Sequence, residues 1–158
     1  MIKRIKEILN EVYLTTLSVD DILSGDDVDI FINPSISELK SVIDNTGKNP
    51  NFASMKGVRF IIDDSGKSFV WGWDEATHGS IWNKLKLNNN VVGGIATVIS
   101  TSGEKYKEVA FDLGNRSLNK RNGYNRSEME DLFFKSSLAK NLGMNIDNTK
   151  VKFFEYEI

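Results

Sequence analysis

The chain has 158 residues, of which 40% are hydrophobic and 27% charged, and these values are ordinary for one globular domain. Its 20 basic and 22 acidic side chains give a net charge of −2, which excludes the global basic field that draws many proteins to nucleic acid. The absence of cysteine excludes disulfides, thiolate metal sites and a cysteine nucleophile.

The chain shows no apolar run long enough to cross a membrane. Its first residues mix basic and acidic side chains and lack the apolar core and the cleavage site of a signal peptide. We therefore expect a protein that does not insert into membranes and is not secreted through a signal peptide.

Residues 2–16 carry apolar side chains at helical spacing, with most charged side chains away from that stripe. This pattern predicts an amphipathic helix, which either caps the core or docks onto a partner. The acidic residues of segment 20–29 lack the ligand spacing of an EF-hand, so this segment is predicted to be a solvated acidic loop.

Residues 28–33 predict a short strand, and a helix is expected directly after it. Ser35 is the expected N-cap of this helix, and Glu38 three residues later completes a capping box. Gly47 is the expected C-terminal stop. Residues 45–57 then form a polar connector.

Residues 58–73 predict a β-hairpin whose turn is centred on Ser65 and Gly66. If one face of the hairpin is buried, an even-length turn gathers the large apolar side chains on that face. The pairs expected from this register are Val58 with Trp73, Phe60 with Trp71, and Ile62 with Phe69. A helix over residues 74–85 is predicted to follow, with Asp74 as its N-cap.

A second hairpin is predicted over residues 95–113, with its turn at Gly103 and Glu104. The expected register places Ala96 and Val98 opposite Phe111 and Val109, respectively. Ser127 and Glu130 predict the capping box of a further helix. Its buried face is expected to carry Phe134, Leu138 and Leu142. Residues 151–158 alternate in the manner of a final strand.

Helices that alternate with hairpins predict a single α+β domain over residues 1–158. The sheet is expected to be mainly antiparallel, with about five to six strands from two hairpins and a C-terminal strand, and about three to four helices packed on one of its faces.

The chain's only histidine, His78, lies in segment 70–82 together with all three tryptophans. It is a candidate general acid or base, with Asp74 or the glutamate after it to orient the ring and Arg59 as a polarising group. No triad spacing supports this role, and helical spacing places His78 beside Trp82. The spacing favours the alternative interpretation, a half-buried histidine hydrogen-bonded between the helix and the hairpin.

A single histidine leaves few ligands for a transition metal, and the aspartates before Ser65 are typical of a hairpin turn. No metal site and no cofactor are therefore predicted. The neighbouring Trp71 and Trp73 are expected to anchor the core rather than to stack on bases.

Segment 114–126 is the best polar candidate for binding. Its four basic residues and no acidic residue give a local charge of +4 (four minus zero). The candidate binding residues are Arg116, Lys120, Arg121, Tyr124 and Arg126, and four asparagines are interleaved with them. Such a segment can hold phosphates or RNA, although no Gly-rich phosphate motif accompanies it. The alternative is a surface loop without a ligand.

The segment VRFIIDDSGKSFVWGWDEATHGSIWNKL resembles a stretch of small, mostly uncharacterised bacteriophage proteins, in which a hairpin ends in a tryptophan and continues into an "ATH" helix. The segments FINPSISELK and KRIKEILNEV are similar in style, so the resemblance covers residues 1–87. Its distinctive residues are Trp71, Thr77 and His78. The resemblance implies a viral origin and carries no established activity.

These features together predict a phage-encoded accessory protein that binds a protein or a nucleic acid, through segment 114–126 or through the helix at 2–16, without catalysis. Its expected location is the cytoplasm of an infected bacterium or the virion. Two alternatives stay open. One is a small enzyme acting on a nucleotide or phosphoester with His78 as acid or base, and the other is a structural or internal head protein of the virion. The oligomeric state is not predicted.

Overall fold

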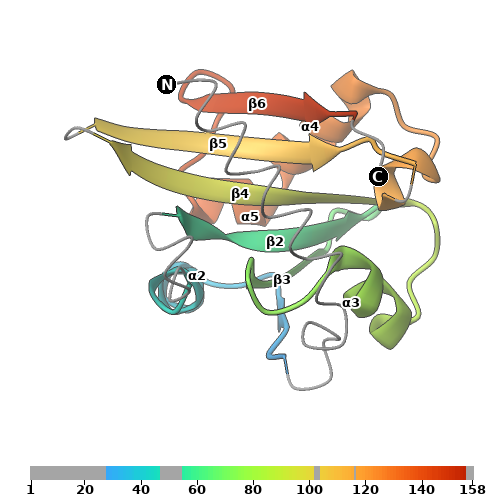
Figure 1. Cartoon of the computed structure of the whole chain (residues 1–158), viewed down its shortest axis with the longest axis horizontal. Helices are drawn as coiled ribbons and strands as arrows, with labels where there is room; N and C mark the ends of the chain where they lie inside the picture. The colour runs from blue at the N-terminus through green and yellow to red at the C-terminus, as the bar shows by residue number, and fades with distance from the viewer. Residues whose placement is uncertain (1–27, 47–54, 102–103, 116, 156–158) are drawn as a thin grey trace.

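The computed structural model describes residues 28–46, 55–101, 104–115 and 117–155 of the chain (Figure 1). Within this part of the chain, one six-stranded sheet has the order β1-β3-β2-β4-β5-β6. The strands are β1 (Phe31–Ile32), β2 (Met55–Asp63), β3 (Ser68–Gly72), β4 (Val91–Thr101), β5 (Glu104–Asp112) and β6 (Thr149–Phe154). All neighbouring strands are antiparallel except β5 and β6, which are parallel. The predicted α+β class and the mainly antiparallel sheet are confirmed.

The helices divide between the two faces of the sheet. They are α2 (Ile36–Asp44), α3 (His78–Leu85), α4 (Arg126–Lys135), α5 (Ser137–Asn141) and the short 3-10 helix η2 (Leu118–Lys120). Side chains of α2, α4 and α5 belong to one buried cluster, and those of α3 and η2 belong to another. We call the face under α2, α4 and α5 the first face, and the opposite one the second face. The expectation that the helices share one face is therefore wrong.

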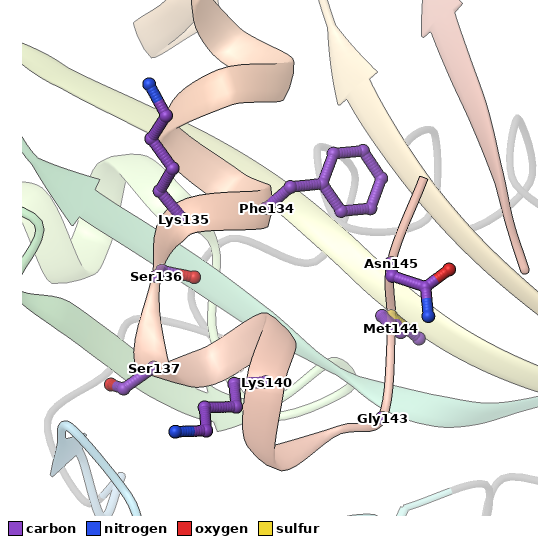
Figure 2. A pocket seen from close by; sticks show the side chains of 8 residues that line it. All are labelled: Phe134, Lys135, Ser136, Ser137, Lys140, Gly143, Met144 and Asn145. Atoms are coloured by element: carbon purple, nitrogen blue, oxygen red, sulfur yellow. The ribbon is translucent and has the colours of Figure 1, made fainter. Parts of the chain in front are cut away.

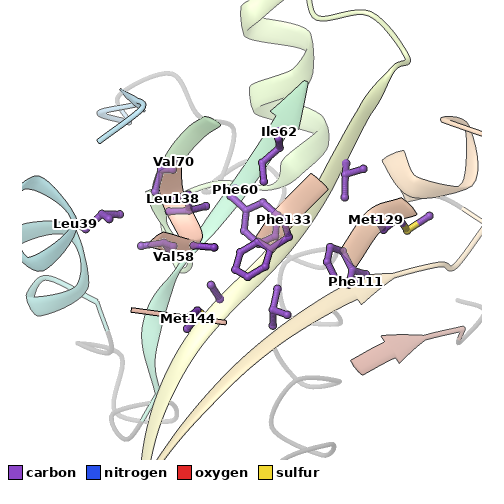
Figure 3. Close-up of a cluster of buried hydrophobic side chains, with 14 of the residues drawn as sticks. Leu39, Val58, Phe60, Ile62, Val70, Phe111, Met129, Phe133, Leu138 and Met144 are labelled. Atoms are coloured by element: carbon purple, nitrogen blue, oxygen red, sulfur yellow. The ribbon is translucent and has the colours of Figure 1, made fainter. Parts of the chain in front are cut away.

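The first face carries the larger core, which is built around three phenylalanine rings (Figure 3). The ring centroid of Phe60 on β2 lies 5.1 Å from that of Phe133 on α4 and 6.2 Å from that of Phe111 on β5. Edge-on and tilted aromatic pairs of this kind add to the gain from burying their apolar area. The second face carries a smaller core under α3 and η2, which includes Ile61, Trp71, Ile81 and Leu118.

The first hairpin has a different register from the predicted one. Phe60 pairs with Val70, and Arg59 pairs with Trp71. The reason is an odd-length turn, in which the backbone N–H of Asp63 donates to the carbonyl of Lys67 and Gly66 has a φ of +89°. Because both faces of this hairpin are buried, the register does not have to gather every large side chain on one face. Phe60 therefore lies on the first face and Trp71 on the second.

The second hairpin has the predicted faces with a shifted register. Ala96 pairs with Val109, and Val98 pairs with Lys107, so the strands are offset by two residues from the prediction. A shift of two residues returns each side chain to the same face, which is why Ala96 and Val109 still belong to the first-face core.

Two adjacent glycines in β4 make room for one ring on each face of the sheet. A Cβ on Gly94 would lie 2.6 Å from Cζ of Phe60 and 2.7 Å from the carbonyl oxygen of Ala110. A Cβ on Gly93 would lie 3.1 Å from Cδ2 of His78. The pair therefore allows close approach of side chains to the middle of the sheet.

The helix starts agree with the prediction in one case out of three. The capping box of Ser35 and Glu38 is present as predicted. Helix α4 begins two residues earlier than predicted, with its capping box formed by Asn125 and Glu128. Helix α3 begins three residues later than the predicted Asp74 cap would place it. Thr77 is its N-cap, because residues 73–75 form a turn instead.

The predicted helix after segment 114–126 is two helices, because Ser136 leaves helical geometry and caps α5. Of its expected buried side chains, Leu138 is buried while Phe134 and Leu142 are half-buried. The final strand begins at Thr149. The predicted helix at 2–16, most of the acidic loop, Gly47 and residues 156–158 lie outside the described residues.

Candidate functional site

His78 is the first residue of α3, and its ring lies on the second face of the sheet. Its Nε2 is 2.8 Å from the carbonyl oxygen of Gly94, so Nε2 carries the ring proton and donates a hydrogen bond to that oxygen. Nδ1 is then an acceptor, and Nη1 of Arg59 donates to it over a long 3.4 Å. The ring also packs edge-on against Trp71, with the centroids 5.5 Å apart. The structure thus brings together two of the three catalytic candidates, His78 and Arg59.

Arg59 lies in β2 and is 1% exposed. Its Nε donates to the carbonyl of Trp73 at 2.6 Å, and its guanidinium also reaches His78. Burial raises the pKa of Asp112, while a hydrogen bond from Gly114 and the charge of Arg59 act in the opposite direction. Arg59 thus joins strand β2, the end of the hairpin and helix α3.

Burial of the ring and, secondarily, the positive charge of Arg59 lower the pKa of His78 to about 3. The charge that shifts this pKa is therefore that of Arg59 and not that of Asp74, the predicted orienting group. A neutral imidazole with one nitrogen donating and the other accepting has neither a free lone pair nor a spare proton for a substrate. This geometry matches the interpretation of a histidine hydrogen-bonded between helix and hairpin.

Segment 114–126 is braced against β4 by two of its asparagines. Nδ2 of Asn119 donates to the carbonyl of Gly93 at 2.7 Å, and Oδ1 of Asn119 accepts from the N–H of Gly93 at 2.9 Å. Nδ2 of Asn122 donates to the carbonyl of Val91 at 2.9 Å. Leu118 between them is buried in the second-face core. Asn119 and Asn122 therefore hold the fold together, a role that the composition of the segment did not reveal.

The basic residues of this segment differ in what surrounds them. Lys120 and Arg121 are exposed, and Cζ of Arg121 lies 5.0 Å from the centroid of the Trp82 ring. Arg126 forms an ion pair with Glu155 and lies over the Phe153 ring. Tyr124 is half-buried, and Arg116 lies outside the described residues.

Lys86, the C-cap residue that follows α3, is exposed as well. We call Trp82, Lys86, Lys120 and Arg121 the basic surface. Its aromatic member comes from α3, so the segment that was predicted to bind supplies only part of it.

An open groove of about 610 Å³ lies beside the junction of α4 and α5 (Figure 2). Phe134, Lys135, Ser137, Lys140 and Met144 are among its lining residues, and no acid or histidine is. The groove therefore lacks a carboxylate or imidazole for acid–base chemistry. The sequence did not predict it.

The described residues contain no group of three or more histidine, aspartate or glutamate side chains placed to hold a metal ion. They also contain no helix that is long and apolar enough to cross a membrane. Comparison with known proteins finds no family, no curated protein and no solved structure that matches this chain.

Proposed function

We propose that this chain is a phage-encoded accessory protein that acts by binding an anionic partner at the basic surface, in the cytoplasm of the infected host or in the virion. One observation carries the proposal. Asn119 and Asn122 fix segment 114–126 to the backbone of β4, and the same segment presents Lys120 and Arg121 to solvent beside Trp82.

Bracing of the segment matters because association loses affinity when it has to order a loop. Here the polar side chains that hold the loop are buried, and the charged ones are exposed. A partner would therefore meet a preformed arrangement of charges.

The chemistry of the basic surface fits phosphate groups. The planar guanidinium of an arginine can bind phosphate through two hydrogen bonds, and its contact with Trp82 limits its conformations. Lys86 and Lys120 add point charges. With a net charge of −2 on the chain, this attraction is local and is screened by salt.

Single-stranded nucleic acid is the partner that this surface favours over an acidic protein. Protein interfaces are usually centred on large apolar or aromatic anchors that become fully buried. The large apolar side chains that the described residues expose are Ile32, Ile36 and Ile146, and none of them belongs to the basic surface. A basic surface with one half-exposed tryptophan is closer to the arrangement that binds single strands.

The test is binding of fluorescently labelled single-stranded DNA and RNA, measured by anisotropy over a series of salt concentrations. The double variant Lys120→Gln, Arg121→Gln is compared with Lys135→Gln, Lys140→Gln, which removes two exposed lysines from helices on the first face. Each phosphate contact contributes about 0.7 to the salt slope, so losing two contacts should lower it by about 1.4. The control should keep the slope of the unmodified chain.

Equal losses in the two double variants would mean that charge alone matters and that the basic surface is not the site. Binding of an acidic protein from infected cells, with no binding of either nucleic acid at low salt, would replace the nucleic acid by a protein partner.

The enzyme alternative has its own experiment. If His78 transfers protons, both His78→Gln and His78→Ala should abolish turnover of nucleotides or phosphoesters while the chain stays folded. The contacts of the ring with Arg59 and Gly94 support a structural role, in which these variants change stability only.

A further inference from the structure

Four side chains form a buried patch on the second face of β4 and β5. They are Ile95, Thr97, Glu108 and Ala110, and each is at most 1% exposed. Alternation along the strands places them on this face, because their neighbours Ala96 and Val109 belong to the first-face core. We call these four residues the β4–β5 patch.

The described elements do not account for this burial. The second-face cluster under α3 and η2 contains Ile61, Trp71 and Val91, but neither Ile95 nor Ala110 belongs to it or to the first-face cluster. In Figure 1, α4 and α5 lie behind β4 and β5, and no described helix lies in front of the middle of these strands. Something beyond the described residues therefore covers the β4–β5 patch.

The polar members of the patch indicate what kind of surface covers them. Both carboxyl oxygens of Glu108 and the hydroxyl of its cross-strand neighbour Thr97 are buried without a hydrogen-bond partner. Burial raises the pKa of Glu108, while the charges of Lys152 and Lys150 on β6 act in the opposite direction. An apolar cover over a neutral acid is consistent with these observations.

We propose that residues 1–27 cover the β4–β5 patch, with the apolar stripe of the helix predicted at 2–16 packed against it. The path of the chain supports this assignment. Val28 and Ile30 pack against the second-face cluster, so the chain enters the described region on this same face. A 15-residue helix is about 22 Å long. It is therefore long enough to lie across β4, β5 and β6, which together span about 14 Å.

A disulfide-trapping experiment tests the proposal directly, because the chain contains no native cysteine. Thr97→Cys is a mild change, since the Thr97 hydroxyl makes no hydrogen bond. It is combined in turn with Ile5→Cys, Ile8→Cys and Val12→Cys along the stripe, in the full chain under mild oxidation. The matched control replaces Thr97→Cys by Ser137→Cys, an exposed position on α5.

The expected result is a cross-link within one chain for at least one stripe position with Thr97→Cys, and none with Ser137→Cys. Failure of all three stripe positions to cross-link would overturn the proposal. A cross-linked dimer without the single-chain product would also overturn it, because it would identify a second copy as the cover.

Discussion

His78 joins helix α3 to the sheet through two contacts of opposite type, since it donates to Gly94 and accepts from Arg59. Both contacts require the neutral ring with its proton on Nε2. A buried arginine beside a histidine repels the protonated form, so the site selects a neutral imidazole by charge as well as by burial. The residue that looked most like a catalyst therefore ties the fold together at neutral pH.

The lowered pKa of His78 predicts a pH-dependent stability. The ordinary value in the unfolded chain is 6.5, and the folded value is about 3, so the unfolded chain takes up the proton first as the pH falls. The stabilisation is full above pH 6.5 and is lost on acidification towards pH 3. The slope should be at most about 1.4 kcal/mol per pH unit.

His78→Gln should flatten this part of the profile, as measured by urea unfolding at a series of pH values. The chain has no other histidine to contribute in that range. Parallel profiles for the two proteins would show that His78 titrates normally in the fold.

Gly94 is a second residue whose role depends on its neighbours, because they leave no room for a side chain there. Gly94→Ala should destabilise the fold by about 1–3 kcal/mol, because the new methyl group meets the Phe60 ring and a backbone oxygen that cannot rotate away. Gly79→Ala, in open space on α3, is the matched control and should be neutral or stabilising by up to about 1 kcal/mol. Thermal unfolding of both variants measures the difference. Equal effects would show that helix and strand propensity, not contact, decides the outcome.

At the scale of elements, local signals were predictable and long-range ones were not. The capping box of Ser35 and Glu38 depends on four consecutive residues, and it forms as predicted. The register of the first hairpin depends on what covers each face, and the assumption of one buried face led to the wrong pairing for Trp71. No pattern within residues 58–73 carries the information that α3 will cover the face opposite to Phe60.

The candidate site shows the same limit. Its residues could be named from the sequence, because His78 is the only histidine and Arg59 lies on the adjacent hairpin. Their roles could not, because the acceptor for His78 is a carbonyl of β4, a strand that follows it in the chain. Composition likewise could not separate Asn119, which faces β4, from Lys120, which faces solvent.

The start of α4 provides a prediction at this scale, because two overlapping capping boxes compete there. Asn125→Ala should destabilise the fold by about 1 kcal/mol, since its side chain accepts from the N–H of Glu128. Ser127→Ala, at the cap that the sequence favoured, should change stability by less than about 0.5 kcal/mol. Chemical unfolding of the two variants gives the comparison. A larger loss for Ser127→Ala would place the helix start at the later position.

At the scale of the whole molecule, the second face combines buried titratable groups whose effects oppose each other. His78 has a lowered pKa, whereas Glu108 and Asp112 have raised ones, and burial is the main cause in all three. Acidification therefore destabilises the fold through protonation of His78 and stabilises it through protonation of the two carboxyl groups. Above pH 4.5 the loss of stability from Glu108 opposes the gain from His78, so the unmodified chain should show a shallower rise in stability there than His78 alone would give.

Glu108→Gln should reveal the carboxyl part of this balance, because an amide imitates the protonated acid at every pH. A raised pKa means that the stabilisation is full below the ordinary value of 4.5 and is lost as the pH rises through the folded value. The variant should therefore match the parent chain below pH 4.5 and exceed its stability at mildly alkaline pH, by about 1–3 kcal/mol for a buried carboxylate without a hydrogen-bond partner. The comparison is made in the His78→Gln background, where the opposing slope is absent.

Asp131→Asn, which removes an exposed acid on α4, serves as the control and should leave the profile unchanged. If Glu108→Gln leaves the alkaline stability where it was, the carboxylate has found a partner when it ionises, and the cover over the β4–β5 patch must supply a donor at that position.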